Sequence, residues 1–288
     1  MIRAFAPAST ANLGPGFDSA AAALDLWNEV TLEPAADCTV EIEGVGADEL
    51  PQDHTHLAVR AFELFARADR YRFRFVNRIP LERGLGSSAA AIALGLVAGA
   101  AVAGDAAGAG ELLAAGARLE GHIDNLAAAL NGGVCVAWTR DAGPAAARIA
   151  CDMPLTPVVV VPAARTNTRH SRNGLPFTVT HTDAATTVAS AALLGAAIAS
   201  GSATLLADAF HDRLHEQYRI SSSPLLQLFQ DDLPHGAGGV TLSGSGPSVV
   251  VWAKRDRLNA VVAAVRQAVP ADTTVLPLRV AQEGATAA

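Results

Sequence analysis

A glycine-rich bend followed at once by a long apolar helix constrains this chain more than any other feature. The bend is Gly84-Leu85-Gly86-Ser87-Ser88, and small and aliphatic side chains fill residues 89–104. A helix that is apolar on all sides is buried in a larger fold, and its first backbone N–H groups bind anions where glycines allow close approach. The pattern therefore predicts a phosphate-binding turn before a buried helix, although an ordinary turn capped by Ser87 fits equally well.

Predicted strands and helices alternate along both halves of the chain. Alternating or fully apolar runs predict strands at residues 2–8, 30–33, 39–43, 71–76, 132–138, 158–161, 240–243, 248–252 and 274–280. Helical spacing predicts helices at residues 56–69, from 87 onward, and at 111–120, 184–199, 202–219 and 257–269. This mixture predicts an α+β or α/β architecture. Because the pattern breaks near residues 141–157, we expect domains at 1–150 and 151–288, with a loose tail at 281–288.

The basic side chains exclude several classes of enzyme. Of the 21 lysines and arginines, Lys254 is the one lysine, and its neighbours match no phosphate-binding motif. A P-loop NTPase, a protein kinase and a Schiff-base enzyme each need a lysine in a defined position, so these classes are excluded. The net charge of −7 argues against nucleic acid as the main partner, because phosphate backbones are bound by basic surfaces.

Cysteine usage and hydropathy indicate a cytoplasmic protein. Cys38, Cys135 and Cys151 are too few and too widely spaced for a zinc site or a disulfide framework. The first residues of the chain lack the apolar core of a signal peptide. The apolar stretch at residues 89–104 is about one turn too short to span a membrane, so no membrane partner is expected.

Two further turns are rich in glycine and polar residues. The first joins Pro7-Ala8-Ser9-Thr10 to Asn12-Leu13-Gly14-Pro15-Gly16-Phe17-Asp18, and the other is Ser243-Gly244-Ser245-Gly246-Pro247-Ser248. Taken alone, each fits a plain turn or a hairpin loop. The dinucleotide-binding pattern G-x-G-x-x-G fails at the central bend, because Ala89 occupies its last glycine position and Glu111 lies in a helical region rather than at a strand end.

The three turns occur together and in order, and this combination resembles the GHMP kinase superfamily, named after galactokinase, homoserine kinase, mevalonate kinase and phosphomevalonate kinase. The three motifs correspond to residues 7–18, 80–90 and 243–248. The resemblance implies an α+β fold, with a ribosomal S5-like N-terminal domain and a ferredoxin-like C-terminal domain. It also implies that the phosphates of ATP bind at the second motif.

Within this superfamily the chain is most similar to the homoserine kinases. Besides the first motif, the similarity rests on Glu120-Gly121-His122-Ile123-Asp124-Asn125, on Thr168-Arg169-His170-Ser171-Arg172 with Leu175-Pro176, and on Asp212-Arg213-Leu214-His215-Glu216-Gln217-Tyr218-Arg219. Three positions depart from the family pattern. Ile123 replaces a proline, His56 replaces an asparagine near the adenine, and Thr187 replaces a second asparagine. These departures fit a divergent homoserine kinase or a related kinase with another acceptor.

The resemblance also implies which residues form the site. The catalytic residues would be Asn12, Asp18 and Thr168, with Asp18 acting as a base or only orienting the hydroxyl. The substrate would be bound by Asn12, Asp18, His122, Asn125, Arg172 and Arg219, with Asp18 and Asn12 at its amino and hydroxyl ends and His122 and Asn125 closing the pocket. The nucleotide would be bound by His56, Pro80, Arg83, Gly84, Leu85, Gly86, Ser87, Ser88, Ala89 and Ala90. The ligands of Mg²⁺ would be Ser88 and Glu120.

The chemistry of these side chains suits a zwitterionic substrate. Arg172 and Arg219 match a carboxylate, because a guanidinium forms bidentate hydrogen bonds with it. Each has a plainer interpretation, Arg172 as a solvated loop residue and Arg219 as a cation at a helix C-terminus. Glu120 offers the hard oxygen that Mg²⁺ prefers, or else is an ordinary surface carboxylate.

Two histidines near the C-terminal arginine raise a separate question. His211 and His215 lie four residues apart and could form half of a zinc site, but no further ligands cluster nearby in the sequence. If residues 202–219 are helical, then Asp212, His215 and Arg219 share one face. In that arrangement His215 packs beneath the site and orients Arg219.

The resemblance implies ATP-dependent phosphorylation of L-homoserine to O-phospho-L-homoserine, on the threonine route, by a homodimer. One alternative is a GHMP-type kinase that acts on another hydroxylated amino acid or small alcohol. Another is a relative that binds its ligand without catalysis, and an intact Glu120 and Ser88 argue against it. An ADP-release assay with several acceptors separates these possibilities.

Overall fold

Two β-sheets form the framework of the chain in the computed structural model, which describes residues 1–166 and 168–288 and gives only the backbone of residues 168–170. The larger sheet has the order β11-β1-β2-β4-β3, and β5 pairs with both β2 and β6. β3 and β4 are parallel, whereas the remaining pairs are antiparallel. The strands are β1 (Ile2–Ala11), β2 (Ala20–Pro34), β3 (Thr39–Gly44), β4 (Tyr71–Asn77), β5 (Val134–Arg140), β6 (Gly143–Ala150) and β11 (Thr286–Ala287).

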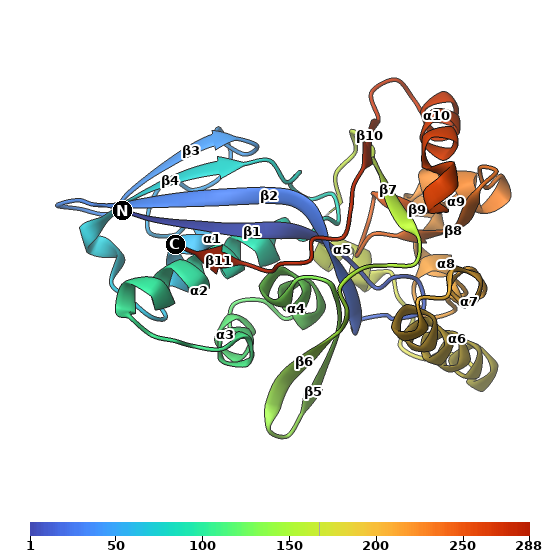
Figure 1. Ribbon diagram of the computed structural model, residues 1–288, viewed down its shortest axis with the longest axis horizontal. Coiled ribbons are helices and arrows are strands. Elements are labelled where there is room, and N and C mark those ends of the chain that lie inside the picture. The colour runs from blue at the N-terminus through green and yellow to red at the C-terminus, as the bar shows by residue number, and fades with distance from the viewer. Residues whose placement is uncertain (167) are drawn as a thin grey trace.

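The smaller sheet is antiparallel and has the order β10-β7-β9-β8. Its strands are β7 (Thr156–Val161), β8 (Ala237–Leu242), β9 (Val249–Ala253) and β10 (Thr274–Pro277). Four consecutive valines of β7 are buried, as a fully apolar central strand requires. Helices α9 (Pro224–Asp231) and α10 (Leu258–Ala268) pack their apolar sides on this sheet (Figure 1).

Helices α1 (Leu57–Phe62), α2 (Ser87–Ala103), α3 (Ala109–Gly116) and α4 (Ile123–Asn131) cover one face of the larger sheet (Figure 1). The predicted buried helix is therefore confirmed as α2, which contacts α1, α4 and β1. Gly95 lets α2 approach α1 closely, because a Cβ at this position would collide with the backbone carbonyl of Ala58. The mixed helix and strand content confirms the predicted α+β class.

The remaining helices lie between or beside the two sheets. They are α5 (Thr168–Asn173), α6 (His181–Ser200), α7 (Ala203–Ala209) and α8 (Glu216–Arg219), with short 3₁₀ turns at Ala68–Arg70, Ile220–Ser222 and Arg255–Arg257. Among the described helices, α6 alone has the length and hydropathy to cross a membrane. Residues 89–104, the longest apolar stretch of the sequence and predicted to be a buried helix too short to span a membrane, belong mostly to the buried α2. Helices of soluble proteins also reach this length and hydropathy, so one such helix is weak evidence for a membrane span. In this fold α6 packs against α7.

The prediction of one helix over residues 202–219 was wrong. Helix α7 ends at Ala209, and a non-helical segment precedes α8. The carboxylate of Asp212 accepts hydrogen bonds from the backbone N–H groups of Leu214, His215 and Glu216. An aspartate that caps a new helix in this way competes with continuation of the old one. Asp212, His215 and Arg219 therefore do not share one helical face.

Other differences concern short or pattern-poor elements. The predicted helix at 56–69 is reduced to α1, and α4, β6 and α9 were not predicted. The tail, predicted to be loose, instead forms β11 on the edge of β1, where Arg3 and the C-terminal Ala288 exchange backbone hydrogen bonds of 2.8 Å. An open sheet edge binds any extended segment through its backbone, so side-chain pattern carries little signal for such pairing.

Candidate active site

The three glycine-rich turns meet in the structure and are hydrogen-bonded to one another. Ser243 Oγ lies 2.7 Å from the carbonyl oxygen of Gly84 and 2.9 Å from Thr10 Oγ1. Asn12 Nδ2 donates to the carbonyl oxygen of Gly244 at 2.9 Å. Gly84 has a positive φ of 74°, and a Cβ there would collide with the Ser243 carbonyl, so glycine is required at this close approach.

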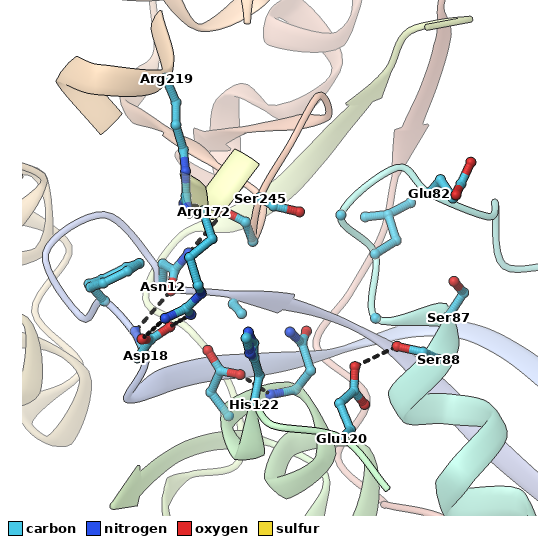
Figure 2. A pocket seen from close by; sticks show the side chains of 18 residues that line it. Asn12, Asp18, Glu82, Ser87, Ser88, Glu120, His122, Arg172, Arg219 and Ser245 are labelled. Atoms are coloured by element: carbon cyan, nitrogen blue, oxygen red, sulfur yellow. Dashed lines mark hydrogen bonds and ion pairs between the residues drawn. The ribbon is translucent and has the colours of Figure 1, made fainter. Parts of the chain in front are cut away.

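Two neighbouring cavities open at this junction. The one shown in Figure 2, which we call the central cavity, is lined by all three turns, by the start of α4 and by Arg172 and Arg219. A second cavity, which we call the adjoining cavity, lies beside His56, and Leu57, Phe75 and Leu94 form its apolar wall. Ser87 and Ser88, at the start of α2, line both cavities.

The wall of the adjoining cavity combines aliphatic and aromatic side chains with a few polar ones at its rim. Leu57, Phe75 and Leu94 supply apolar surface, and Glu49 and Arg165 supply charge. An apolar space that opens beside a helix N-terminus can hold an aromatic ring whose charged extension reaches that N-terminus. The two cavities together therefore suit a nucleotide and a smaller polar molecule that meet at the start of α2.

Asp18 and Arg172 face each other across the mouth of the central cavity (Figure 2). Arg172 Nη1 and Nη2 donate to the two carboxylate oxygens of Asp18 at 2.9 and 2.6 Å. The side chains are 39% and 43% exposed for Arg172 and Asp18. Asn12 Oδ1 accepts the backbone N–H of Asp18 at 3.0 Å, which fixes the turn that presents the carboxylate.

Arg219 reaches the same cavity from the C-terminal half and is 4% exposed. An arginine N–H can only donate, so Arg219 Nη1 donates to His215 Nδ1 at 3.1 Å. His215 Nε2–H then donates to the carbonyl oxygen of Gly14 at 2.9 Å. Burial lowers the pKa of His215, which keeps the ring neutral and leaves Nδ1 free to accept. His215 thus lies against Arg219, as predicted, although it precedes helix α8 rather than lying within it.

Phe17 joins the two arginines. The guanidinium carbons of Arg172 and Arg219 lie 5.5 and 5.6 Å from the centre of its ring, and His215 stacks on the ring at 4.9 Å. Burial and then the charge of Arg172 lower the pKa of Arg219. The Nε atoms of both arginines are buried without a hydrogen-bond partner among the described residues. Two close guanidinium groups with unused donors form a binding site for an anion.

Glu120 lies opposite the start of α2 (Figure 2). Ser88 Oγ donates to its Oε1 at 2.6 Å, whereas its buried Oε2 has no partner among the described residues. Burial raises the pKa of Glu120, and the nearby carboxylate of Asp124 adds to this effect. A buried carboxylate oxygen and a serine hydroxyl beside an anion site match the hard ligands of a divalent cation.

Asp124 was not among the predicted site residues, although it lies within the motif of residues 120–125. It is 3% exposed, lines the central cavity, and accepts a hydrogen bond from the backbone N–H of Asn125 at 2.7 Å. Burial raises its pKa. The partial positive charge at the N-terminus of α4 offsets part of the negative charge of such a carboxylate. A cationic ligand would offset more of that charge. Its place in the sequence could have indicated this role, because Asp124 lies between His122 and Asn125, which were both assigned to the substrate.

His122 and Asn125, predicted to contact the substrate, both line the central cavity. His122 Nδ1 is buried without a partner among the described residues. Asn125 has a structural contact as well, because its Oδ1 accepts a hydrogen bond from Ser9 Oγ at 2.8 Å. The structure therefore brings these two residues together with Asn12, Asp18, Arg172 and Arg219.

The residues predicted to bind nucleotide divide into two groups. The turn residues Gly84, Leu85, Gly86, Ser87 and Ser88 line the central cavity. Pro80, Arg83, Ala89 and Ala90 do not line either cavity. Arg83 instead donates to the backbone carbonyls of Leu81, Pro162 and Ala163, which ties the bend to the segment after β7.

His56 lies in the adjoining cavity, where an adenine contact was predicted. Its Nδ1 accepts the backbone N–H of Ala58 at 3.3 Å, and its ring lies 4.4 Å from that of Phe75. Burial lowers the pKa of His56 to about 4, so the ring is neutral at physiological pH. The His56 ring is 3% exposed and packs on Phe75, so it supports the wall of the adjoining cavity.

The sequence singled out three other positions. The side chain of Thr168 lies outside the described residues. Thr187 Oγ1 accepts the backbone N–H of Arg213 at 3.0 Å and so supports the segment before α8. Among the described residues, no group of three histidine, cysteine or acidic side chains is placed to hold a metal ion, and His211 is not paired with His215 in such a group.

Comparisons with known proteins agree with this geometry. Family models described as GHMP kinases N terminal domain and GHMP kinases C terminal match residues 56–133 and 190–271. A homoserine kinase of Clavibacter michiganensis subsp. michiganensis is 40% identical over 254 residues, which cover 85% of this chain and 80% of that protein. A homoserine kinase of Streptomyces coelicolor is 38% identical over 275 residues, which cover 91% and 87%.

Solved structures show the same fold. The crystal structure of homoserine kinase from Cytophaga hutchinsonii superimposes with a TM-score of 0.86 and 24% identity, covering 100% of this chain and 97% of that one. The structure of L. major mevalonate kinase in complex with R-mevalonate superimposes with a TM-score of 0.71 and 15% identity, covering 96% and 95%. The fold predicted from the three turns is therefore confirmed.

Proposed function

This chain belongs to the homoserine kinase family of the GHMP kinases, and on that premise we propose that it transfers the γ-phosphoryl group of ATP to the hydroxyl of L-homoserine. The product is O-phospho-L-homoserine, on the route to threonine. The observation that carries the proposal is Arg219, a guanidinium that is 4% exposed and has a buried Nε without a partner among the described residues. Burying a cation of this kind costs free energy unless the cation binds an anion. Arg172 lies at a similar distance from the Phe17 ring and would bind the same anion.

The acceptor has a place for each of its charged ends. We assign its carboxylate to Arg172 and Arg219, whose guanidinium groups converge on one ring. We assign its ammonium group to Asp124, because a buried carboxylate in the cavity wall needs a cation. His122 and Asn125 complete this side of the cavity.

The nucleotide is assigned to the adjoining cavity and to the bend before α2. A helix N-terminus has free backbone N–H groups and a positive dipole end, and both favour phosphate. Ser87 and Ser88 line both cavities, so a phosphate chain there connects the two. The base lies beside His56 and Phe75 in this assignment. No lysine is needed in this assignment, because the backbone N–H groups at the start of α2 would offset part of the phosphate charge and a bound metal ion would offset more of it.

The residues around Glu120 fit Mg²⁺. Its buried, unpartnered Oε2 and the hydroxyl of Ser88 would be its protein ligands, and phosphate oxygens and water would supply the others. When bound there, Mg²⁺ neutralises the charge on the phosphates. The protein's own part is to keep Glu120 ionised and directed at the start of α2, which the hydrogen bond from Ser88 favours.

The reaction joins the acceptor oxygen to the γ-phosphorus and breaks the bond to the oxygen that bridges the β- and γ-phosphates, and ADP leaves with that electron pair. Such transfers pass through a loose transition state, so alignment contributes more than a strong base. We therefore assign Asp18 and Asn12 to orienting the hydroxyl, whose proton passes to the transferred phosphoryl group. Thr168 stays a predicted contact of the hydroxyl.

Release of ADP in the presence of ATP and Mg²⁺ tests this proposal across L-homoserine, L-threonine, L-serine and mevalonate. We expect the highest kcat/KM with L-homoserine. A preference for an alcohol without an amino-acid carboxylate would instead support the alternative, a GHMP-type kinase with another acceptor. Nucleotide binding without turnover of any acceptor would support a ligand-binding relative.

Three broader expectations belong to the same proposal. We propose domains at residues 1–150 and 151–288, since β6 pairs in the larger sheet and β7 in the smaller one, although β11 returns to the larger sheet. We also propose a homodimer in the cytoplasm. Light scattering of the purified protein tests the dimer, and a mass near twice 29.4 kDa is expected.

A further inference from the structure

An ion pair between the two halves of the chain crosses the edge of the adjoining cavity. Arg165 donates through both Nη atoms to the two carboxylate oxygens of Glu49, with Nη2 and Oε1 2.9 Å apart. Both residues line the adjoining cavity, and the side chains of Arg165 and Glu49 are 46% and 42% exposed, so they lie where that cavity meets solvent. The hydrogen bonds from Arg165 lower the pKa of Glu49, so both groups are charged near neutral pH.

The segment that carries Arg165 is fastened to the bend before α2. Arg83 donates to two of the backbone carbonyl oxygens of this segment at 2.9 and 2.6 Å, and the N–H of Thr166 donates to the carbonyl oxygen of Glu82 at 3.0 Å. Glu49 belongs instead to the loop between β3 and α1. Because the adjoining cavity is lined by both the bend and this loop, the ion pair connects two sides of one cavity.

Arg165 differs from the other residues of this cavity in origin and in charge. Among the described residues, it alone lines the adjoining cavity from the C-terminal half, since the remaining lining residues fall within 28–94. It is also the one arginine or lysine among them. Glu82 lies 3.9 Å from Arg165 Nη1, but it belongs to the bend to which the segment is already fastened. Of these two contacts, the one with Glu49 therefore bridges the cavity.

The cavity has room for a ligand while the pair is closed. Its volume is about 410 Å³, and sites for small molecules span roughly 300–1,000 Å³. Movement of a ligand across this edge is different, because the two side chains must first separate. The next step rests on the proposed function, which places the nucleotide in this cavity. We propose that Glu49 and Arg165 form a latch across its edge, which slows both the entry and the release of the nucleotide.

A latch is separable from a plain effect of charge. The nucleotide is an anion, so if charge alone mattered, loss of the Glu49 charge would strengthen its binding and loss of the Arg165 charge would weaken it. A latch needs both partners, so loss of either one opens it. Because a latch that closes over the empty and the occupied cavity slows entry and release alike, its loss raises both rates and leaves Kd nearly unchanged.

Stopped-flow fluorescence with mant-ADP and Mg²⁺ tests the latch in the whole chain, using Glu49→Gln, Arg165→Gln and the double variant. We expect each single variant to raise the association and release rates of mant-ADP about two- to fivefold, with Kd within about twofold of wild type. The double variant should match the single ones rather than multiply their effects. Glu41→Gln is the matched control, because Glu41 pairs with Arg74 at 3.0 Å and lines neither cavity, and its rates should equal those of wild type.

Release that is no faster in Glu49→Gln than in wild type would overturn the latch. Slower release there, with faster release in Arg165→Gln, would show that Arg165 acts on the nucleotide through its charge alone. Effects that multiply in the double variant would also overturn it, because the two side chains would then act independently. If mant-ADP does not bind to the wild-type protein, the proposed nucleotide site and the latch are both refuted. If it binds but L-homoserine is not phosphorylated, only the proposed acceptor is refuted, and the release rates still decide on the latch. Thermal melting verifies that the variants are folded.

Discussion

Ser243 and Gly84 lie 159 residues apart in the sequence, and the hydroxyl of Ser243 donates a hydrogen bond to the carbonyl oxygen of Gly84 at 2.7 Å. This contact joins the C-terminal turn to the bend before α2. Both turns approach so closely that a Cβ at position 84 would collide with the Ser243 backbone. The shape of the candidate phosphate site therefore depends on a residue from the other half of the chain.

Replacement of Ser243 by alanine tests this dependence. The variant removes the hydrogen bond to Gly84 and the contact with Thr10 Oγ1 in a buried setting, so we expect the free energy of unfolding to fall by about 1–2 kcal/mol. We also expect a higher KM for ATP. Ser200→Ala is the control, since its hydroxyl donates within α6 to the carbonyl oxygen of Ala197. Denaturant unfolding and steady-state kinetics measure both effects, and equal loss in the two variants would contradict the account.

Loss of the Glu120 charge should weaken the use of Mg²⁺. We expect Glu120→Gln to raise the Mg²⁺ concentration needed for half-maximal rate by about 10- to 100-fold. The reason is that the buried Oε2 has no partner among the described residues and is the oxygen available to the ion. Glu111→Gln, a change of the same kind at the start of α3, should leave this concentration unaltered. An unchanged Mg²⁺ dependence in Glu120→Gln would remove Glu120 from the metal site.

Arg219 should contribute to acceptor binding but not to nucleotide binding. We expect Arg219→Ala to raise the KM for homoserine by about 100-fold, because one partner of a buried charge pair is lost. The KM for ATP should stay within about twofold of the wild-type value, since Arg219 lines only the central cavity. Arg213→Ala, at an exposed position in the same segment, is the control. Equal loss of both substrates would count against the assignment.

Asp124 should recognise the ammonium group of the acceptor. We expect Asp124→Asn to lower kcat/KM for homoserine by about 100-fold and to affect 4-hydroxybutanoate, which has no ammonium group, much less. The physical reason is that a buried carboxylate in the cavity wall attracts a cation strongly. Steady-state kinetics with the two acceptors provides the comparison. Parallel losses for both acceptors would mean that Asp124 supports α4 rather than binding substrate.

Glu216 should make the stability of the protein depend on pH. Burial raises its pKa to about 8, whereas the unfolded chain titrates near the ordinary value of 4.5. The folded state therefore holds a proton that the unfolded state releases, and stability falls as pH rises from 4.5 to 8. The slope is about 1.4 kcal/mol per pH unit where the two states differ by a full proton.

The variant Glu216→Gln isolates this effect. Its amide oxygen can still accept the backbone N–H of Leu242, which the carboxylate accepts at 2.7 Å. We expect the variant to gain stability relative to wild type as the pH rises through this range, with the difference levelling off above pH 8. Denaturant unfolding at several pH values measures the difference. A difference that is constant with pH would show that Glu216 is ionised in the folded protein.

Sequence patterns predicted the local parts of this fold better than the long-range ones. The buried helix α2 and strands such as β4 and β7 were predicted, because their apolar patterns are set by neighbours in the sequence. The pairing of β11 with β1 and the cap that Asp212 gives to α8 were not. Backbone pairing at a sheet edge has no sequence period, and a single capping carboxylate can end a helical pattern.

The candidate site shows the same limit. Its residues were selected by resemblance, and the structure brings most of them to one cavity. Arg83 was placed with the nucleotide, but its guanidinium is occupied by backbone carbonyls of the segment after β7. Asp124 and Phe17 were not selected, because their importance comes from burial and from the approach of two distant arginines. Neither property is visible in a single sequence.

A crystal structure with a non-hydrolysable ATP analogue, Mg²⁺ and L-homoserine tests the central claim most directly. We predict phosphates against the backbone N–H groups of residues 84–88, the base beside His56, and the acceptor's carboxylate between Arg172 and Arg219. A nucleotide bound elsewhere, with this bend left empty, would contradict the account.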